Sequence, residues 1–526
     1  MSATGSESSS ERAEAPATDR AVGPEVAVLT VLAAVAGIVL RFTTRSGLWL
    51  DEALSVNIAE LPLGEIAGAL RQDGHPPLYY YLLHLWIRVV GDTDLAVRSL
   101  SGLLAVLALP LAYLAGRRIG GRLLGAVALG VFALTPFLIR YGTEARMYAL
   151  VTLLVLVAYL LVDDIVRRGR ATWWRVGLLA LVVAAGLWTH YWTMWPTAAL
   201  TLVLLWTWRR AATPEMRTGA IRAQVGLVGA GVLFLPWVPT LLYQSANTGT
   251  PWSGPVRPVA FVALTFTDLG GGPFADAQFV GTTLVVLVLL GVFGRGLTSR
   301  RIELDLAAVP ELRAEAAVAA LTMVFGLAVT YATWSAYATR YAAVFVPLLL
   351  LFAAAGITRF VGRAALVIVY AVTLGMLAMG GLFNITYDRT QTKALAPVAS
   401  ERASAGDVVV TCPDQLGPAT IRAFPDDLVV VGYPTLEAPE RIDWVDYSDR
   451  PDVDPDAYAA EVLALAGPDH DVFMVWSTTY VTHEGTCEAL VDAFGRQRPA
   501  ETLVNQDGSQ YFESASLTIF AAPAPA

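Results

Sequence analysis

The sequence carries little charge for its length, and this excludes an ordinary soluble protein. Only 15% of its 526 residues are charged, whereas 55% are hydrophobic, and the mean hydropathy is +0.55. Apolar runs recur between Val26 and Asn384, each of about 20 residues, the length that an α-helix needs to cross a bilayer. The composition therefore predicts a polytopic α-helical membrane protein.

Acidic residues are sparse in most of the chain but not at its end. Up to Thr386 the sequence holds 28 basic and 22 acidic residues, whereas from Tyr387 onward it holds 8 basic and 23 acidic ones. We therefore expect a transmembrane domain over 25–386 and an acidic soluble domain over 387–526. Residues 1–24 lack an apolar core, so we expect a disordered tail without a cleavable signal peptide.

Eleven apolar stretches predict membrane spans, and the arginines between them predict their orientation. The stretch His75 to Val90 is too short to span after its two prolines, and its aromatic residues suit the membrane interface. If it lies along the surface, five arginine-rich connections fall on the side of the N-terminus, which the positive-inside rule places in the cytoplasm. We therefore expect a horizontal helix at 76–90 and an outer C-terminal domain. The predicted spans are 24–41, 95–115, 122–140, 146–162, 174–189, 191–208, 221–243, 278–294, 315–334, 341–358 and 364–384.

This orientation gathers polar residues without an obvious structural role at the outer face. Ionisable groups near a membrane are usually functional, so the set predicts a site. Two long Gly/Pro-rich loops, 243–258 and 267–278, fall on the same face, either as mobile covers or as plain linkers. The outer residues are Asp51, Glu52, His75, Glu144, Arg146, His190, Trp252 and Arg340.

The acidic domain alternates strand-like and helix-like patterns, which predicts a small α/β domain. We expect strands at "DVVVTC", "DLVVVGY", "DVFMVWST" and "SASLTIFAA", and helices at "DAYAAEVLALAG" and "CEALVDAFG". The only two cysteines of the chain, Cys412 and Cys487, lie here. On an oxidising side of the membrane they would form a disulfide, and two buried free thiols are the alternative.

Several motifs carry a family resemblance over residues 25 to 360. They are "WLDE" at 49–52, "HPPLYY" at 75–80, "RSLSGL" at 98–103, "YGTEARMYAL" at 141–150 and "ATRY" at 338–341. Together they resemble the polyprenyl-phosphate-dependent membrane glycosyltransferases of the GT-C fold. The resemblance is to the branch (family 39-like) that contains protein O-mannosyltransferases and the aminoarabinose transferase of lipid A.

The resemblance implies roles for the outer residues. Asp51 matches the family's catalytic acid and is expected to act as the general base for the acceptor hydroxyl, with Glu52 orienting it or binding the sugar. Arg340 is the first candidate for the donor phosphate, since Arg binds phosphate in bidentate fashion. A snorkelling interfacial Arg and a solvated acid pair are the structural alternatives.

The remaining candidates are less strongly assigned. Arg146 is expected either to bind phosphate or to pair with Glu144 in a structural lock. His75 and His190 are expected to contact phosphate or sugar, or to cap, pack or join an interfacial aromatic belt. Asp51, Glu52 and Glu144 could hold a divalent cation, but we expect no metal and no cofactor.

The sequence thus predicts an inverting glycosyltransferase of the plasma membrane. Its donor would be a polyprenyl-phosphate sugar of mannose or arabinose type, its acceptor a cell-envelope glycan, lipid or protein, and its other contacts membrane lipids, with no nucleic acid. A non-enzymatic transporter of lipid-linked sugars or an assembly scaffold is the alternative. Discontinuous helices with charges near the midplane would favour transport, but the charges cluster at one face.

Overall fold

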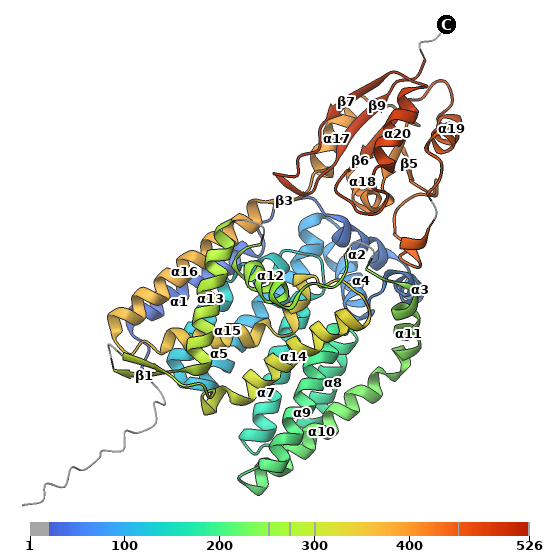
Figure 1. Ribbon diagram of the computed structural model, residues 1–526. Helices are drawn as coiled ribbons and strands as arrows, with labels where there is room; N and C mark the ends of the chain where they lie inside the picture. Colours follow the sequence, from blue (N-terminus) through green and yellow to red (C-terminus); the bar gives the residue numbers. More distant parts are fainter. Residues whose placement is uncertain (1–19, 251–252, 273–274, 299–300, 451, 524–526) are drawn as a thin grey trace, which may run out of the picture.

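The chain folds into a bundle of helices, from Pro24 to Thr386, and a smaller α/β domain that sits on one end of the bundle (Figure 1). Six helices among the described residues are long and apolar enough to cross a membrane, and five more are apolar but shorter. The predicted fold class is confirmed, whereas the count of eleven spans and their orientation remain predictions. The computed structural model describes residues 20–250, 253–272, 275–298, 301–450 and 452–523, so most of the predicted N-terminal tail lies outside it.

Each predicted span coincides with helical structure. The horizontal stretch is also a helix, α4, which packs against α2. The helices of this part are α1 (Pro24–Leu40), α2 (Leu50–Glu60), α3 (Leu63–Asp73), α4 (Leu78–Val90), α5 (Asp94–Leu134), α6 (Pro136–Gly142), α7 (Tyr148–Val162), η1 (Asp163–Arg167), α8 (Trp173–Leu187), η2 (Tyr191–Thr193), α9 (Met194–Arg210), α10 (Pro214–Phe234), η3 (Leu235–Trp237), α11 (Val238–Asn247), α12 (Pro258–Gly270), α13 (Ala275–Phe293), η4 (Pro310–Leu312), α14 (Arg313–Ala332), η5 (Thr339–Val344), α15 (Val346–Thr358) and α16 (Arg363–Thr386).

Helix α5 covers two predicted spans because it turns back on itself. The backbone leaves the helical conformation at Gly120 and Gly121, and the φ of Gly121 is +78°, which glycine adopts at little cost. The two halves then pack closely, since a Cβ at Gly125 would lie 2.9 Å from the carbonyl oxygen of Tyr113.

Close packing also fixes α15, the helix that follows Arg340. A Cβ at Gly356 would lie 2.0 Å from the carbonyl oxygen of Leu287 in α13, and one at Gly291 would lie 1.9 Å from that of Phe352. Small residues let membrane helices approach in this way. This packing fixes the position at which η5, the short helix that contains Arg340, joins α15.

One arginine-rich connection has more structure than expected. β1 (Gly294–Thr298) and β2 (Arg301–Leu304) pair antiparallel after α13, with residues 299–300 outside the described part of the chain. The sequence showed only a basic connection here.

The C-terminal domain has a five-stranded sheet in the order β5-β4-β6-β9-β7, with helices on both faces. β4 is parallel to β5 and β6, and β9 is antiparallel to β6 and β7. Alternate residues face opposite sides: Val408 and Val410 pack with α19 and α20, whereas Val409 packs with α17. The elements are α17 (Thr392–Ser400), β4 (Val408–Cys412), η6 (Asp414–Leu416), α18 (Gly417–Ala423), β5 (Val429–Gly432), η7 (Tyr447–Asp449), α19 (Pro455–Ala466), β6 (Val472–Trp476), α20 (Thr486–Gly495), β7 (Ala500–Val504) and β9 (Ser516–Phe520).

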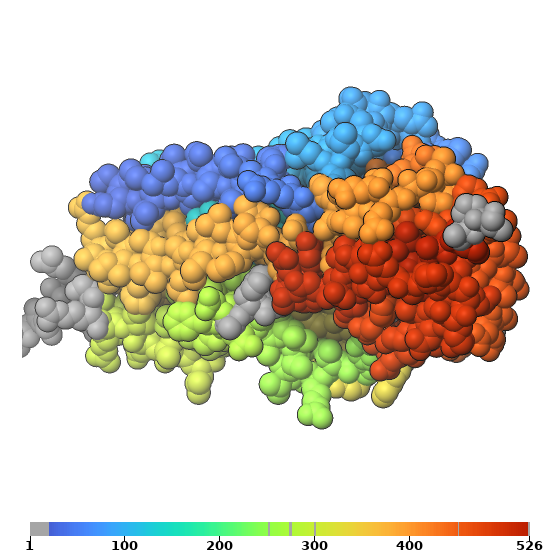
Figure 2. Space-filling model, turned by 90° about the horizontal axis from the view of Figure 1, so that it is seen from above, coloured from blue at the N-terminus to red at the C-terminus, as the bar shows by residue number. Residues whose placement is uncertain are grey.

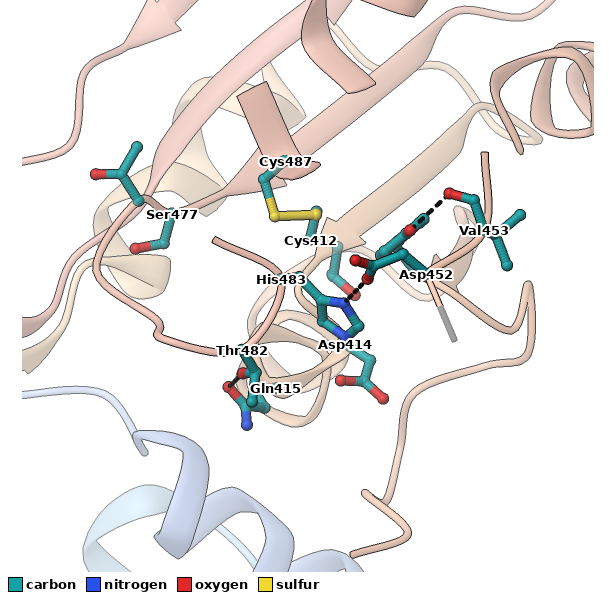
Figure 3. Close-up of a disulfide and its surroundings, with 12 residues drawn as sticks. Cys412, Asp414, Gln415, Asp452, Val453, Ser477, Thr482, His483 and Cys487 are labelled. Atoms are coloured by element: carbon teal, nitrogen blue, oxygen red, sulfur yellow. Dashed lines mark hydrogen bonds and ion pairs between the residues drawn. A yellow bond between two sulfur atoms is a disulfide. The ribbon is translucent and has the colours of Figure 1, made fainter. Parts of the chain in front are cut away.

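All six predicted elements of this domain are present. The structure also joins Cys412 and Cys487 in a disulfide, so that of the two alternatives the bridge is the one formed. The bridge ties the end of β4 to the start of α20, in the same part of the domain as Gln415 of η6 and the loop that carries Thr482 (Figure 3).

A short parallel pair of strands connects the two parts of the molecule. β3 (Asp388–Thr390) leaves the last membrane helix and pairs with β8 (Tyr511–Glu513), near the end of the chain. Seen from above, the C-terminal domain covers one end of the bundle, while α1 and α16 lie side by side at the other end (Figure 2). The predicted site lies at this end of the bundle, beneath the C-terminal domain.

Candidate active site

The acid pair lies in the first turn of α2, and its two members face different surroundings. Trp49 precedes the helix in extended conformation, so Asp51 and Glu52 are among its first residues. Carboxylates suit this end of a helix because the macrodipole is positive there. Asp51 remains partly exposed, at 15%, whereas Glu52 is completely buried.

Asp51 meets two arginines from distant elements. Its Oδ2 lies 3.3 Å from Nη2 of Arg340 in η5 and 3.8 Å from Nη2 of Arg146, in the loop before α7. The structure therefore brings together the predicted base and both predicted phosphate ligands. Arg146 forms its ion pair with Asp51 and, among the residues described, none with Glu144, so the predicted lock between residues 144 and 146 is not formed.

Arg146 is held by one partner on α2 and one in the loop between α3 and α4. Its Nη1 donates to Ser55 Oγ at 2.8 Å, and its Nη2 donates to Nε2 of His75 at 3.2 Å. Because Arg146 donates to Nε2, it is Nδ1–H of His75 that donates to Oδ2 of Asp73, at 2.8 Å. Burial raises the pKa of Asp73, but His75, Arg146 and Tyr80 together lower it, so the pKa is below its usual value.

His190 lies behind this network and is buried in aromatic rings. Its ring centroid is 5.2 Å from that of Tyr341 and 5.7 Å from that of Tyr148. Nδ1 accepts from the backbone N–H of Trp192, and Nε2 is buried without a hydrogen bond. Burial, with His75 and the nearby arginines, lowers the pKa of His190 well below its usual value. The imidazole is therefore neutral.

Glu144 is also buried beside the site. Trp49 Nε1 donates to its Oε1 at 2.8 Å, and its Oε2 has no hydrogen bond. Burial raises the pKa of this carboxyl, and the arginines nearby lower it only in part.

Glu52, which we expected to orient Asp51 or to bind the sugar, is not among the residues that line the cavity described below. It accepts two hydrogen bonds from Arg98, at 2.7 and 2.6 Å, and one from Arg389 in β3 at 3.4 Å. The backbone N–H of Ala145 adds a fourth donor at 2.9 Å. Because all these partners are protein groups and the side chain has no exposure, Glu52 fastens α2 to its neighbours.

A cavity of about 450 Å³ opens beside Asp51, between the helical bundle and the C-terminal domain. We call the two sides its floor and its roof. The floor holds the cations Arg146 and Arg340, whereas the lining residues of the roof carry no positive charge. The floor is lined by Trp49, Leu50, Asp51, Leu54, Asp73, His75, Arg146, Gly249, Ser253, Ala336, Tyr337, Ala338, Arg340 and Tyr341, and the roof by Gln415, Trp444, Thr479, Tyr480, Val481, Thr482, Phe512 and Glu513.

Among the described residues, six buried polar atoms without hydrogen bonds belong to residues that line this cavity or lie beside it. Such atoms are rare in folded proteins, because each one loses its hydration without compensation. Here they come from predicted site residues and one tyrosine beside them, which is the state expected of groups that meet a polar ligand. They are Oδ2 of Asp51, Oε2 of Glu144, Nε of Arg146, the hydroxyl of Tyr148, Nε2 of His190 and Nε of Arg340.

Sequence reasoning missed Arg98, Arg389 and Glu513. Each lies far along the chain from α2 and contacts it only in the fold. Arg98 stands in the "RSLSGL" motif, which signalled the family but no role. Glu513 is an isolated acid before the last strand, and nothing in its surroundings marks it.

The described residues contain no group of three or more His, Cys, Asp or Glu side chains placed to hold a metal ion. Of the three carboxylates considered for a cation, Glu52 points toward Arg98 and away from the cavity. Trp252 and parts of both outer loops, at 251–252 and 273–274, lie outside the described residues, although Gly249 and Ser253 of the first loop line the cavity.

Comparison with known proteins agrees with this architecture. The family model of dolichyl-phosphate-mannose-protein mannosyltransferases matches residues 74–238. The fold is similar to that of ArnT from Cupriavidus metallidurans in the apo state, with TM-score 0.60, 12% identity, and coverage of 94% of this chain and 97% of that one. ArnT bound to undecaprenyl phosphate gives TM-score 0.54 at 13% identity, with the same coverage of both chains.

A third similar structure is the oligosaccharyltransferase of Archaeoglobus fulgidus in complex with Zn and sulfate. Its TM-score is 0.51 at 11% identity, and the match covers 88% of this chain and 69% of that one. No curated protein sequence matches significantly. The chain is thus a multi-pass membrane protein with the GT-C glycosyltransferase fold, and the resemblance to family 39-like enzymes is confirmed.

Proposed function

We propose that this protein is a membrane glycosyltransferase that moves a sugar from a polyprenyl-phosphate donor to an acceptor hydroxyl. One observation carries the proposal: Asp51 lies between two arginines at a cavity, and both arginines keep a buried Nε without a hydrogen bond. The undecaprenyl phosphate bound by the similar ArnT structure supports a donor of the same class.

Asp51 acts as the general base in this proposal. The acceptor oxygen attacks C1 of the sugar, and the bond between C1 and the phosphate oxygen breaks with its electron pair on the phosphate. The acceptor proton passes to the Asp51 carboxylate, which lies partly exposed in the cavity. A single displacement of this kind inverts the configuration at C1.

The two arginines bind the leaving phosphate. Its negative charge grows as C1–O breaks, and fixed cations stabilise that change in the transition state. Arg340 contacts Asp51 only through its Nη2, and its Nε is unpartnered. A bound donor phosphate would therefore form a second ion pair with Arg340 and weaken the ion pair between Arg340 and Asp51. His75 keeps Arg146 in place through the bond from Nη2.

Glu144 and His190 contribute polar contacts at the edge of the site. Each is buried and keeps one atom without a partner, Oε2 and Nε2 respectively. His190 is neutral with Nδ1 accepting, so Nε2–H is available as a donor to a sugar hydroxyl or phosphate oxygen. Glu52 serves indirectly, by holding α2 where Asp51 needs to be.

The orientation in the membrane, the role of each domain and the classes of sugar and acceptor belong to the same proposal. The cavity faces the outer side of the plasma membrane, with the N-terminus in the cytoplasm, because the arginine-rich connections lie on the opposite side. Residues 25–386 form the catalytic domain, and residues 387–526 close the cavity from outside. The donor sugar is of mannose or arabinose type, and the acceptor is a glycan, lipid or protein of the cell envelope.

The test compares wild type with Asp51→Asn in membranes at equal expression. The probes are undecaprenyl-phosphate mannose and arabinose with labelled sugars, and transfer to membrane acceptors is measured beside binding of undecaprenyl phosphate. We expect binding to persist and transfer to fall by about 10²- to 10⁴-fold, the usual contribution of general base catalysis. Wild-type transfer by the variant would remove Asp51 as the base.

The same experiment distinguishes a transporter or scaffold. Such a protein would move or hold the lipid-linked sugar without forming a new glycosidic bond, so wild type itself would show binding but no transfer. A mass change in the envelope glycans of a deletion strain would identify the acceptor.

A further inference from the structure

The helix that carries Asp51 lacks a cap from its own sequence. Helix N-termini expose backbone N–H groups that usually bond to a Ser, Thr, Asp or Asn side chain at the capping position. In α2 that position is Trp49, whose side chain makes no such bond.

A carboxylate from the C-terminal domain takes the place of this cap. The backbone N–H of Leu50 donates to Oε2 of Glu513 at 2.9 Å, across 463 residues of sequence. Leu50 directly precedes Asp51, so the bond fixes the start of the helix at the residue beside the proposed base. A carboxylate suits this place because the macrodipole is positive there.

Glu513 is itself held in a fixed orientation. Thr390 Oγ1 donates to Oε1 at 2.7 Å, and the hydroxyl of Tyr480 donates to Oε2 at 3.3 Å. The strand pairing of β3 with β8 places Thr390 opposite Glu513. Its position therefore follows from the connection between the two domains, and the carboxyl cannot drift without breaking three hydrogen bonds.

We propose that Glu513 is a positioning residue, which caps α2 from the C-terminal domain and so holds Asp51 in place for catalysis. The proposal rests on the proposed function for its catalytic meaning, although the cap is a structural claim that can be tested alone. It makes the C-terminal domain a part of the active site.

The titration of Glu513 gives the proposal a pH signature. The pKa of this carboxyl is raised to about 7, and burial is the largest cause. The hydrogen bonds from Thr390, Leu50 and Tyr480 lower the pKa in part, and the neighbouring charge of Asp51 raises it. The titratable groups that face it are Asp51 from α2 and Tyr480 from the loop after β6. An ionised carboxylate is the stronger acceptor at a helix N-terminus. The cap thus tightens as pH rises through 7.

The same titration of Glu513 affects the stability of the fold in the opposite direction. Because the pKa in the folded state lies above that of an exposed Glu, protonation favours the folded state. This contribution is fully present below about pH 4.5 and is lost as pH rises through about 7. Turnover and stability should therefore change in opposite directions over this range.

The experiment uses the full-length protein and the variants Glu513→Ala and Glu513→Gln, with Glu501→Ala as control. Glu501 is an exposed acid of the same domain, paired with Arg402 at the surface. Hydrogen exchange of the amides of residues 50–56 reports on the cap without any substrate. Transfer from labelled undecaprenyl-phosphate mannose or arabinose, whichever wild type uses, is followed between pH 5.5 and 8.5.

We expect Glu513→Ala to speed exchange in residues 50–56 by about tenfold. Its turnover should fall by about 10- to 100-fold while binding of undecaprenyl phosphate is kept, since misplacing a reacting group has effects of this order. Glu513→Gln should restore slow exchange, because its amide oxygen still accepts from Leu50. It should lack the rise of turnover near pH 7 that wild type shows.

Wild-type exchange and turnover in Glu513→Ala would overturn the proposal. If that variant fails to fold, Glu513→Gln decides: a wild-type pH profile overturns the proposal, and a flat one supports it. Failure of the proposed function is recognised separately, by an active Asp51→Asn, and leaves the exchange result interpretable.

Discussion

Two clusters of acids and arginines meet the first turn of α2 on adjacent faces, and they differ in exposure, contact distance and hydrogen bonding. On the inner side, Glu52 has no exposure and bonds to Arg98 at 2.6 and 2.7 Å. On the cavity side, Asp51 is 15% exposed and meets Arg340 at 3.3 Å and Arg146 at 3.8 Å.

The difference separates a structural ion pair from a site. A fully buried pair needs short contacts and complete hydrogen bonding, and the Glu52 cluster has both. The Asp51 cluster has longer contacts, a cavity beside it and polar atoms without partners. Asp51 and Glu52 thus have different surroundings, although they are adjacent in one motif, because Glu52 faces protein and Asp51 faces the cavity.

Breaking the inner cluster should have the largest effect on the fold. Glu52→Gln leaves Arg98 and Arg389 buried beside a neutral group, and breaking a buried pair costs about 3–5 kcal/mol. We expect a clear fall of the melting temperature in detergent. Glu65→Gln, at an exposed acid of the next helix, α3, is the control and should change stability by less than about 0.5 kcal/mol. Equal melting of the two variants would contradict the structural role of Glu52.

Breaking the cavity cluster should affect turnover instead. Arg340→Ala removes a cation from the leaving phosphate, and we expect the rate to fall by roughly 10²- to 10³-fold, about 3–4 kcal/mol in the barrier. Arg340→Lys should recover part of the rate, because Lys restores the charge without the bidentate geometry. The measurement is single-turnover transfer beside the melting temperature. A rate loss explained by unfolding would count against the assignment.

A smaller effect is expected at the roof, which belongs to neither cluster. The disulfide between Cys412 and Cys487 lies near Gln415 and Thr482, two of the residues that line the roof (Figure 3). Replacing both with Ser should lower the stability of the C-terminal domain by about 2–4 kcal/mol. The described residues of the roof include no cation for the donor phosphate, so we expect its loops to contact the acceptor, and the apparent KM for acceptor should rise more than that for donor. A change in donor KM alone would contradict this division of the cavity.

The fold could be predicted well because its signals are local. Apolar length and strand or helix periodicity located the helices of residues 24–386 and all six expected elements of the C-terminal domain. The cavity residues were also within reach: the outer-face argument grouped Asp51, His75, Arg146 and Arg340, and the structure places them side by side. Their roles remain predictions.

The division of labour between the two acids could not be predicted. Glu52 is adjacent to Asp51, and only its partners distinguish it. Those partners, Arg98 and Arg389, lie 46 and 337 residues away. Glu513 is farther still, and its bond to Leu50 depends on the pairing of β3 with β8. No local pattern encodes contacts of this kind.

The most direct test of the central claim examines Asp51→Asn and Glu52→Gln together, with melting temperature, undecaprenyl-phosphate binding and single-turnover transfer measured on each. We predict that Asp51→Asn keeps the fold and the binding but loses transfer by at least about 10²-fold. Glu52→Gln should lose stability, and its folded fraction should lose much less transfer than Asp51→Asn does. Wild-type transfer by Asp51→Asn, or the same pattern of loss in both variants, would contradict the assignment of Asp51 to chemistry and Glu52 to structure.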